Sequence, residues 1–129
     1  IRDVAVTGVQ TCALPISQAD WRTQLAAWMP TQSADVLVKG GHSDEQAVRN
    51  VWFRRPHCQS DYQPSQEWQW PRLSGEFHGS GCTLAAAIAG QLACGAAMPE
   101  ALSRAQAYTQ QALERAFSVG AGQKIPDRS

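Results

Sequence analysis

The strongest constraint on the fold is the stretch of residues 83–93, which carries no charge and is dense in Ala, Leu and Ile. A helix of this composition has no polar face suited to solvent, so it must be covered on most of its sides. The glycine-punctuated turn of residues 75–81 comes directly before it. We therefore expect a buried helix that begins at a tight turn.

A second helix is expected after it. Pro99 and Glu100 suit the first turn of a helix, and apolar residues then recur at helical spacing through residues 101–117. The same spacing occurs in residues 18–29 and stops at Pro30. These patterns predict two amphipathic helices, one before and one after the apolar helix in the sequence. Residues 120–129 contain two glycines and a proline and are expected to form a loop or an extended end.

Three short stretches have the character of β-strands. Residues 34–38 and 48–53 are rich in β-branched residues, and in residues 67–73 Trp68 and Trp70 alternate around Gln69. We expect residues 34–38 to form a buried strand, and Trp68 and Trp70 to share one face of another. Helices and strands in one chain of 129 residues predict a single α/β domain.

The charge balance argues against polyanionic partners. Eleven basic and eleven acidic residues give a net formal charge of zero, so neither nucleic acid nor an anionic membrane is expected to bind. The longest apolar stretch, residues 82–98, is interrupted by glycines and is not expected to span a membrane. No secretory signal is expected at the start of the chain.

The cysteines lack the short paired spacings of a zinc site or a redox couple. We expect free thiols, no metal site among these residues, and a cytoplasmic location. Cys94 is expected to pack in the core, whereas His57 and Cys58 are expected on a surface loop.

The turn before the apolar helix is the strongest candidate for chemistry. Gly79 and Gly81 flank Ser80, so backbone N–H groups at the helix start can converge on an anion, aided by the helix dipole. Fixed donors of this kind stabilise a phosphoryl group during transfer. Cys82 would lie in the first helical turn, where a thiolate is favoured and could act as a base or a nucleophile. From these residues alone, a tightly packed glycine turn with Cys82 as a small core residue is the favoured interpretation.

Longer motifs add a resemblance. The sequences HGSGCTLAAAIAGQLACG (78–95), PEALSRAQAYTQQALERAF (99–117) and GAGQKIPDR (120–128) resemble the C-terminal part of hydroxymethylpyrimidine/phosphomethylpyrimidine kinases of thiamine biosynthesis. VLVKGGH (36–42) resembles their preceding strand and turn. The resemblance runs from about residue 17 to the end, with a diverged middle near residues 54–66.

The resemblance implies a ribokinase-like fold, with a central, mostly parallel sheet and helices on both faces. It implies transfer of the γ-phosphoryl group of ATP, with Mg²⁺, to the hydroxymethyl or phosphate group of a pyrimidine. Cys82 takes the place of the catalytic base, Gly79, Ser80 and Gly81 form the anion hole, and Lys39 contacts nucleotide phosphates. Many relatives carry threonine at Ser80. Without the resemblance, Lys39 is equally well explained as a solvated turn residue.

Other readings remain open at this point. The chain resembles less than half of a family member, so we expect the parent enzyme to be active and this chain to be inactive alone. One alternative is a nucleotide- or anion-binding module without chemistry. Another is a different vitamin or sugar kinase of the ribokinase-like group. Other kinases of that group carry aspartate at the position of Cys82, so Cys82 argues against a sugar kinase and favours the vitamin kinases. A homo-oligomeric parent is also open, and His42 is left unassigned.

The start of the chain has a different character. Residues 6–16, VTGVQTCALPI, resemble one translated frame of a sequencing adapter. We therefore expect residues 1–16 to be a non-native leader. Residues 17–129 would then be the C-terminal part of one ribokinase-like kinase domain. The alternative for residues 6–16 is an ordinary strand that ends at a proline.

Overall fold

The computed structural model describes residues 34–40, 46–54 and 63–129. These residues fall into two compact units, one ending at Pro71 and the other beginning at Arg72. The first unit contains a sheet and the second contains two helices and the C-terminal tail. Three predictions lie outside the described residues. They are the helix over residues 18–29, the leader over residues 1–16 and the surface loop with His57 and Cys58.

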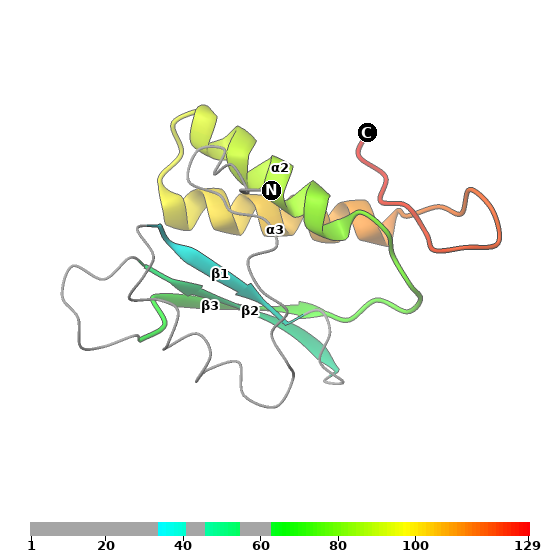
Figure 1. Cartoon of the computed structure of the whole chain (residues 1–129), viewed down its shortest axis with the longest axis horizontal. Coiled ribbons are helices and arrows are strands. Elements are labelled where there is room, and N and C mark those ends of the chain that lie inside the picture. Colours follow the sequence, from blue (N-terminus) through cyan, green and yellow to red (C-terminus); the bar gives the residue numbers. More distant parts are fainter. Residues whose placement is uncertain (1–33, 41–45, 55–62) are drawn as a thin grey trace. The chain divides into compact units, whose positions relative to one another are not determined.

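The sheet unit contains three strands in the order β1-β2-β3 (Figure 1). The strands are β1 (Val36–Lys39), β2 (Ala47–Phe53) and β3 (Gln66–Pro71). The three predicted strands are thus confirmed, with bounds shifted by one or two residues. The alternation expected in β3 is confirmed as well, because Trp68 and Trp70 are half-buried while Gln69 is exposed.

All pairings of the described strands are antiparallel. This differs from the mostly parallel sheet that the resemblance implied. For β1 and β2 the physical reason is their short connection, residues 40–46, since a parallel crossover needs about a dozen residues or more. The described sheet therefore supplies only antiparallel pairs to the fold.

Burial is concentrated at the end of the central strand. Val51, Trp52 and Phe53 are all buried, so both faces of β2 are shielded from solvent there. β1 is only half-buried and its Lys39 is exposed, so the expectation of a buried first strand is wrong. Among the described strands β1 pairs with β2 alone and forms an edge, which leaves more of it open to solvent.

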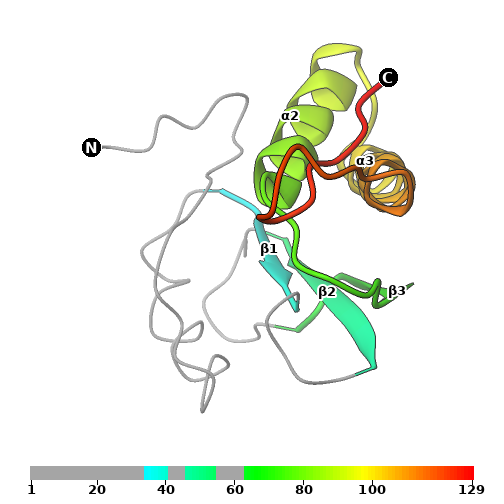
Figure 2. The ribbon, with the colours of Figure 1, turned by 90° about the vertical axis from the view of Figure 1, so that its right-hand side faces the viewer.

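The helical unit is built from α2 (Ser80–Ala93) and α3 (Met98–Glu114), which pack against each other (Figure 2). Small residues allow the close approach of the two helices. The buried apolar side chains of this pair are Leu84, Ile88, Ala101, Leu102, Ala105 and Ala112. The helices predicted over residues 83–93 and 101–117 are both confirmed.

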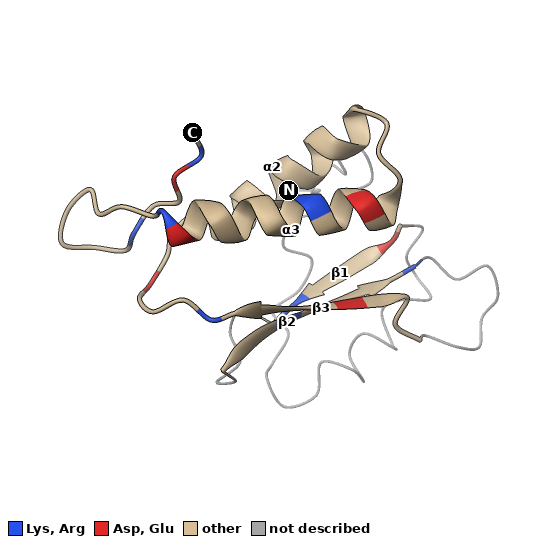
Figure 3. Cartoon of the chain, turned by 180° about the vertical axis from the view of Figure 1, so that it is seen from behind, with Lys and Arg blue, Asp and Glu red and all other residues tan. Residues whose placement is uncertain are grey.

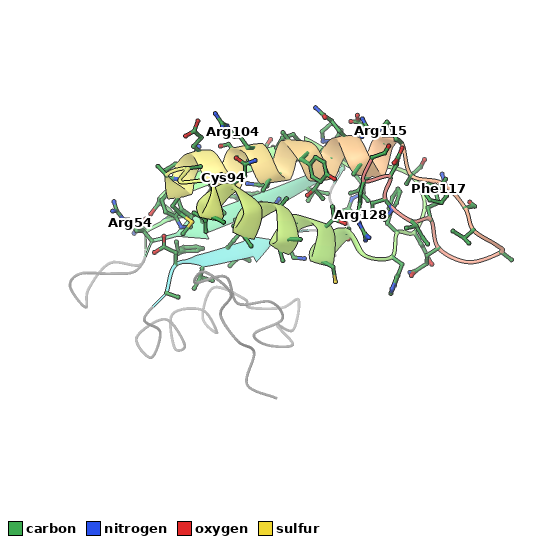
Figure 4. All side chains as sticks on the ribbon, turned by 90° about the horizontal axis from the view of Figure 1, so that it is seen from above. Arg54, Cys94, Arg104, Arg115, Phe117 and Arg128 are labelled. Carbon is green, nitrogen blue, oxygen red and sulfur yellow. The ribbon has the colours of Figure 1, made fainter. Side chains whose placement is uncertain are left out.

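α2 carries no charged residue along its length, as the sequence indicated (Figure 3). Its expected burial holds for one face only, because Leu84 and Ile88 are buried whereas Ala86, Gly90 and Ala93 are exposed. Cys94, the residue after α2, is also exposed. The expectation that Cys94 packs in the core is therefore wrong, because the helix has already ended when the chain reaches it (Figure 4).

α3 ends at Glu114, three residues before the predicted end. The chain leaves the helix because Phe117 and Ile125 form an antiparallel bridge with two hydrogen bonds, of 3.1 and 2.9 Å. The tail that follows contains no helix, as expected. None of the helices in the described part of the chain is long and apolar enough to cross a membrane.

Candidate functional site

The turn that precedes α2 is built on a glycine in the left-handed conformation. Gly79 has φ of 88° and ψ of 5° and caps the helix. A Cβ at this position would lie 2.9 Å from Nη2 of Arg128. Glycine is favoured here for two reasons. Its backbone reaches positive φ without strain, and it has no Cβ to press against the guanidinium group.

The Gly79 carbonyl is held by one residue through two hydrogen bonds. Thr83 donates to it from its backbone N–H (2.9 Å) and from its hydroxyl (2.8 Å). Thr83 itself is buried. The orientation of the peptide group that links Gly79 to Ser80 is therefore well determined.

The first N–H groups of α2 are suited to an anion. In the described structure α2 has neither a side-chain cap nor an acidic residue in its first turn. Ser80 and Gly81 are half-buried, and the positive end of the helix dipole lies at their N–H groups. The turn can therefore donate several hydrogen bonds to one anionic group.

Cys82 lies in the first turn of α2, as predicted, and is exposed. The alternative that it is a small core residue is wrong. An exposed thiol beside the uncapped N–H groups of the turn fits a group that reacts with or takes a proton from a bound molecule. The sequence-predicted residues Gly79, Ser80, Gly81 and Cys82 are thus brought together at one helix start.

The C-terminal tail packs directly beside this turn. His78 N–H donates to the Lys124 carbonyl (2.9 Å), and Lys124 N–H donates to the Glu76 carbonyl (2.9 Å). Phe77 and Lys124 form a parallel bridge. The GAGQKIPDR segment, which in the sequence carries only the family resemblance, therefore lies beside the candidate site.

Arg128 brings a positive charge from this tail to the start of α2 (Figure 4). Its Nε donates to the hydroxyl of Thr83 at 3.0 Å. Its own carbonyl accepts a hydrogen bond of 3.0 Å from the Tyr108 hydroxyl. Sequence reasoning missed Arg128 because it lies in an irregular segment far from the turn in the chain, where no periodicity marks it.

Asp127 anchors the same tail. The backbone N–H of Ser129 (3.0 Å) and then its hydroxyl (2.8 Å) stabilise the carboxylate and lower the pKa of Asp127 below its ordinary value. Arg115 adds a weaker attraction at 3.7 Å. Asp127 N–H also donates to the Ala112 carbonyl of α3 (2.9 Å). The tail is therefore tied to the helix on one side while it reaches the turn on the other.

Lys39 lies at the exposed end of β1, in the sheet unit. The next residue, Gly40, donates its N–H to Oδ1 of the buried Asn50 (3.2 Å). A Cβ on Gly40 would collide with the backbone carbonyl of Arg49, so only glycine fits there. Lys39 thus belongs to the sheet unit and the turn of α2 to the helical unit. His42 lies outside the described residues.

No group of three or more His, Cys, Asp or Glu side chains that could hold a metal occurs in residues 34–40, 46–54 and 63–129. Mg²⁺ usually binds through one or two carboxylates together with substrate phosphates. The described residues therefore offer no protein cage for Mg²⁺.

Comparison with known proteins gives a consistent result. Residues 10–127 match the pattern of a family described as phosphomethylpyrimidine kinase. A hydroxymethylpyrimidine/phosphomethylpyrimidine kinase from Rhizobium meliloti (strain 1021) is 34% identical over 117 residues, covering 86% of this chain and 40% of that protein. The thiamine biosynthesis bifunctional protein ThiED of Geobacter sulfurreducens is 37% identical over 89 residues, covering 68% of this chain and 17% of that protein.

A solved structure agrees with the fold. The pyridoxal kinase from Staphylococcus aureus in complex with ADP superimposes with a TM-score of 0.68 at 21% identity, covering 88% of this chain and 39% of that one. At this identity the likeness concerns the fold alone. The described architecture is part of a ribokinase-like α/β fold, and the chain spans about 40% of the length of the Rhizobium meliloti protein.

Proposed function

The chain belongs to the phosphomethylpyrimidine kinase family, and on that premise we propose that it carries the phosphoryl-transfer end of an ATP-dependent kinase. The acceptor is hydroxymethylpyrimidine, its monophosphate, or both, in thiamine biosynthesis. One observation carries the proposal: at the start of α2, N–H groups without a side-chain cap lie next to an exposed Cys82.

The roles follow from the geometry of the turn. The N–H groups of Ser80 and Gly81 donate hydrogen bonds to the oxygens of the γ-phosphoryl group, on which negative charge is spread during transfer. Cys82 is the base that takes the proton of the acceptor hydroxyl. That oxygen bonds to the γ-phosphorus while the bond to the bridging oxygen breaks, and ADP leaves.

Lys39 supplies a point charge to the nucleotide phosphates in this proposal. Its exposed position at the end of β1 and the hydrogen bond that holds the next residue, Gly40, to Asn50 support the role. Mg²⁺ would enter with the ATP phosphates, and it supplies charge neutralisation during transfer. The free thiols of Cys82 and Cys94 favour a reducing cytoplasm as the location.

The activity is assigned to a protein of the relatives' full length. The chain spans about 40% of the Rhizobium meliloti relative, and phosphoryl transfer needs the acceptor, the metal and the nucleotide to be held together. We propose that the 129 residues alone bind nucleotide but transfer no phosphoryl group.

A chimera tests the proposal. Residues 17–129 replace the matching part of the Rhizobium meliloti relative, and ATP-dependent phosphorylation of hydroxymethylpyrimidine is measured. Cys82→Ser should lower kcat by about a hundredfold or more, which is the usual contribution of a general base. Cys94→Ser is the matched control, because this exposed thiol lies just beyond the far end of the same helix, and it should leave kcat unchanged.

Two results would contradict the proposal. Equal kcat values for the Cys82→Ser and Cys94→Ser chimeras would remove the base role from Cys82. A folded chimera that binds ATP but transfers nothing to the pyrimidine, under conditions in which the intact relative is active, would favour a nucleotide-binding module without chemistry.

A further inference from the structure

The C-terminal tail makes a contact whose effect extends to the anion-binding turn. We propose that Arg128 is a positioning residue that holds the N–H groups of this turn in place through Thr83. The inference rests on the proposed function of the turn, and it adds a residue and a means of control.

The first step concerns the hydroxyl of Thr83. Arg128 Nε can only donate, so Thr83 Oγ1 accepts in their 3.0 Å hydrogen bond. A hydroxyl has one proton. Because the oxygen receives Arg128 on one side, its own proton is directed to the Gly79 carbonyl, 2.8 Å away. Arg128 therefore selects the hydroxyl orientation that holds the turn.

The second step concerns the peptide group of the turn. The described chain has no cis peptide bonds, so the Gly79 carbonyl and the Ser80 N–H belong to one planar trans unit and point in opposite directions. The carbonyl points into the helix, toward Thr83. The N–H of Ser80 must then point out of the helix start, toward the place where an anion would bind. Fixing the carbonyl thus fixes the donor.

The third step is the anchoring of Arg128 itself. Its carbonyl accepts from Tyr108 of α3, and the adjacent Asp127 is held by Ala112 and Ser129. The guanidinium also lies against Gly79, since Nη2 would be 2.9 Å from a Cβ there. A continuous series of contacts therefore runs from α3 through the tail to the turn.

The test uses the full 129-residue chain, labelled with ¹⁵N, without nucleotide. Arg128→Gln should speed the amide exchange of Thr83 by about tenfold or more, the effect expected from losing a hydrogen bond to a charged group. It should also shift the amide resonances of Ser80 and Gly81. Arg115→Gln is the matched control, because Arg115 contacts Asp127 and Ser129 of the same tail. Arg115→Gln should leave the amide exchange of Thr83 and the resonances of Ser80 and Gly81 unchanged.

The coupling through Thr83 has its own readout. In a Thr83→Val background Arg128 has no hydroxyl to hold, so adding Arg128→Gln should cause little further change in the Ser80 and Gly81 resonances. Arg128→Lys keeps the charge and a donor and should restore part of the wild-type pattern. Equal effects of the Arg128→Gln and Arg115→Gln variants on the turn, or full additivity with Thr83→Val, would overturn the inference.

Titration with ATP separates the inference from the proposed function. The Arg128→Gln chain should bind ATP several-fold more weakly than wild type, up to about tenfold, and the Arg115→Gln chain should bind like wild type. Unchanged binding by Arg128→Gln would overturn the link between turn geometry and phosphate. A wild-type chain that does not bind ATP, but whose turn responds to Arg128→Gln as described, would contradict the proposed function and leave the positioning role standing.

Discussion

Replacing Gly79 by alanine tests whether the left-handed backbone of the turn is essential to the helical unit. At φ of 88°, alanine meets a steric cost of about 1–2 kcal/mol that glycine avoids. The new Cβ would also press on Nη2 of Arg128 at 2.9 Å, although the end of that side chain can move. The smaller entropy of the unfolded alanine chain returns about 0.4–1 kcal/mol. We expect a net destabilisation of about 1 kcal/mol.

Gly90→Ala is the matched control for this change. Gly90 lies within α2, is exposed, and a Cβ there would meet nothing within 4 Å. Alanine should therefore stabilise the helix by about 0.5–1 kcal/mol through its higher helix propensity. The same substitution at two glycines of one helix, the first at its N-cap and the second within it, thus has opposite expected signs.

The assay is urea denaturation of the full chain, followed by far-ultraviolet circular dichroism at equal protein concentration. The Gly79→Ala midpoint should fall and the Gly90→Ala midpoint should rise relative to wild type, with unchanged slopes. If the Gly79→Ala chain is as stable as the Gly90→Ala chain, the left-handed turn is not a constraint on this fold. The reasoning about Arg128 and the Ser80 N–H would then lose its basis.

Three further outcomes are expected. Because the folded pKa of Asp127 lies below the unfolded value of about 3.9, its contribution to tail stability is present above that value and lost as pH falls through the folded pKa. The Ser129 amide resonance should report a midpoint below about 3.9, and a midpoint above it would contradict the assignment. Asn50→Ala should cost about 1–3 kcal/mol in urea denaturation, because a buried acceptor for Gly40 is removed, and an unchanged midpoint would argue against it. Lys39→Ala should change stability by less than about 0.5 kcal/mol while weakening ATP binding in the chimera, and normal ATP binding would remove Lys39 from the site.

The parts of the site that could be predicted from the sequence depend on local signals. Two glycines flank Ser80 and an uncharged helical stretch follows, so the turn, the helix start and the place of Cys82 can all be derived from neighbouring residues. The strands can likewise be predicted to within one or two residues, because β-branched and aromatic stretches are also local signals. Family resemblance then supplied the chemistry that these elements alone left open.

The parts that could not be predicted depend on residues distant in the chain. Arg128 and Thr83 are 45 positions apart, and neither carries a mark of their contact. The exposure of Cys94 depends on where α2 stops, and the direction of strand pairing depends on the length of the connections rather than on strand composition. Periodicity specifies which face of an element is apolar, but it contains no information on which tail will reach that element.

This difference bears on how the turn could respond to substitution. The donors of the turn belong to α2, whereas the cation beside them belongs to the tail, which α3 anchors. A change in the tail can therefore alter the orientation of the Ser80 N–H without touching any residue of the turn. Tyr108→Phe removes one anchor of Arg128 and leaves every group that adjoins the anion site in place. Comparing this variant with wild type would therefore measure how much the orientation of the donors contributes, because the donors themselves are the same. Local sequence motifs alone do not distinguish the two contributions.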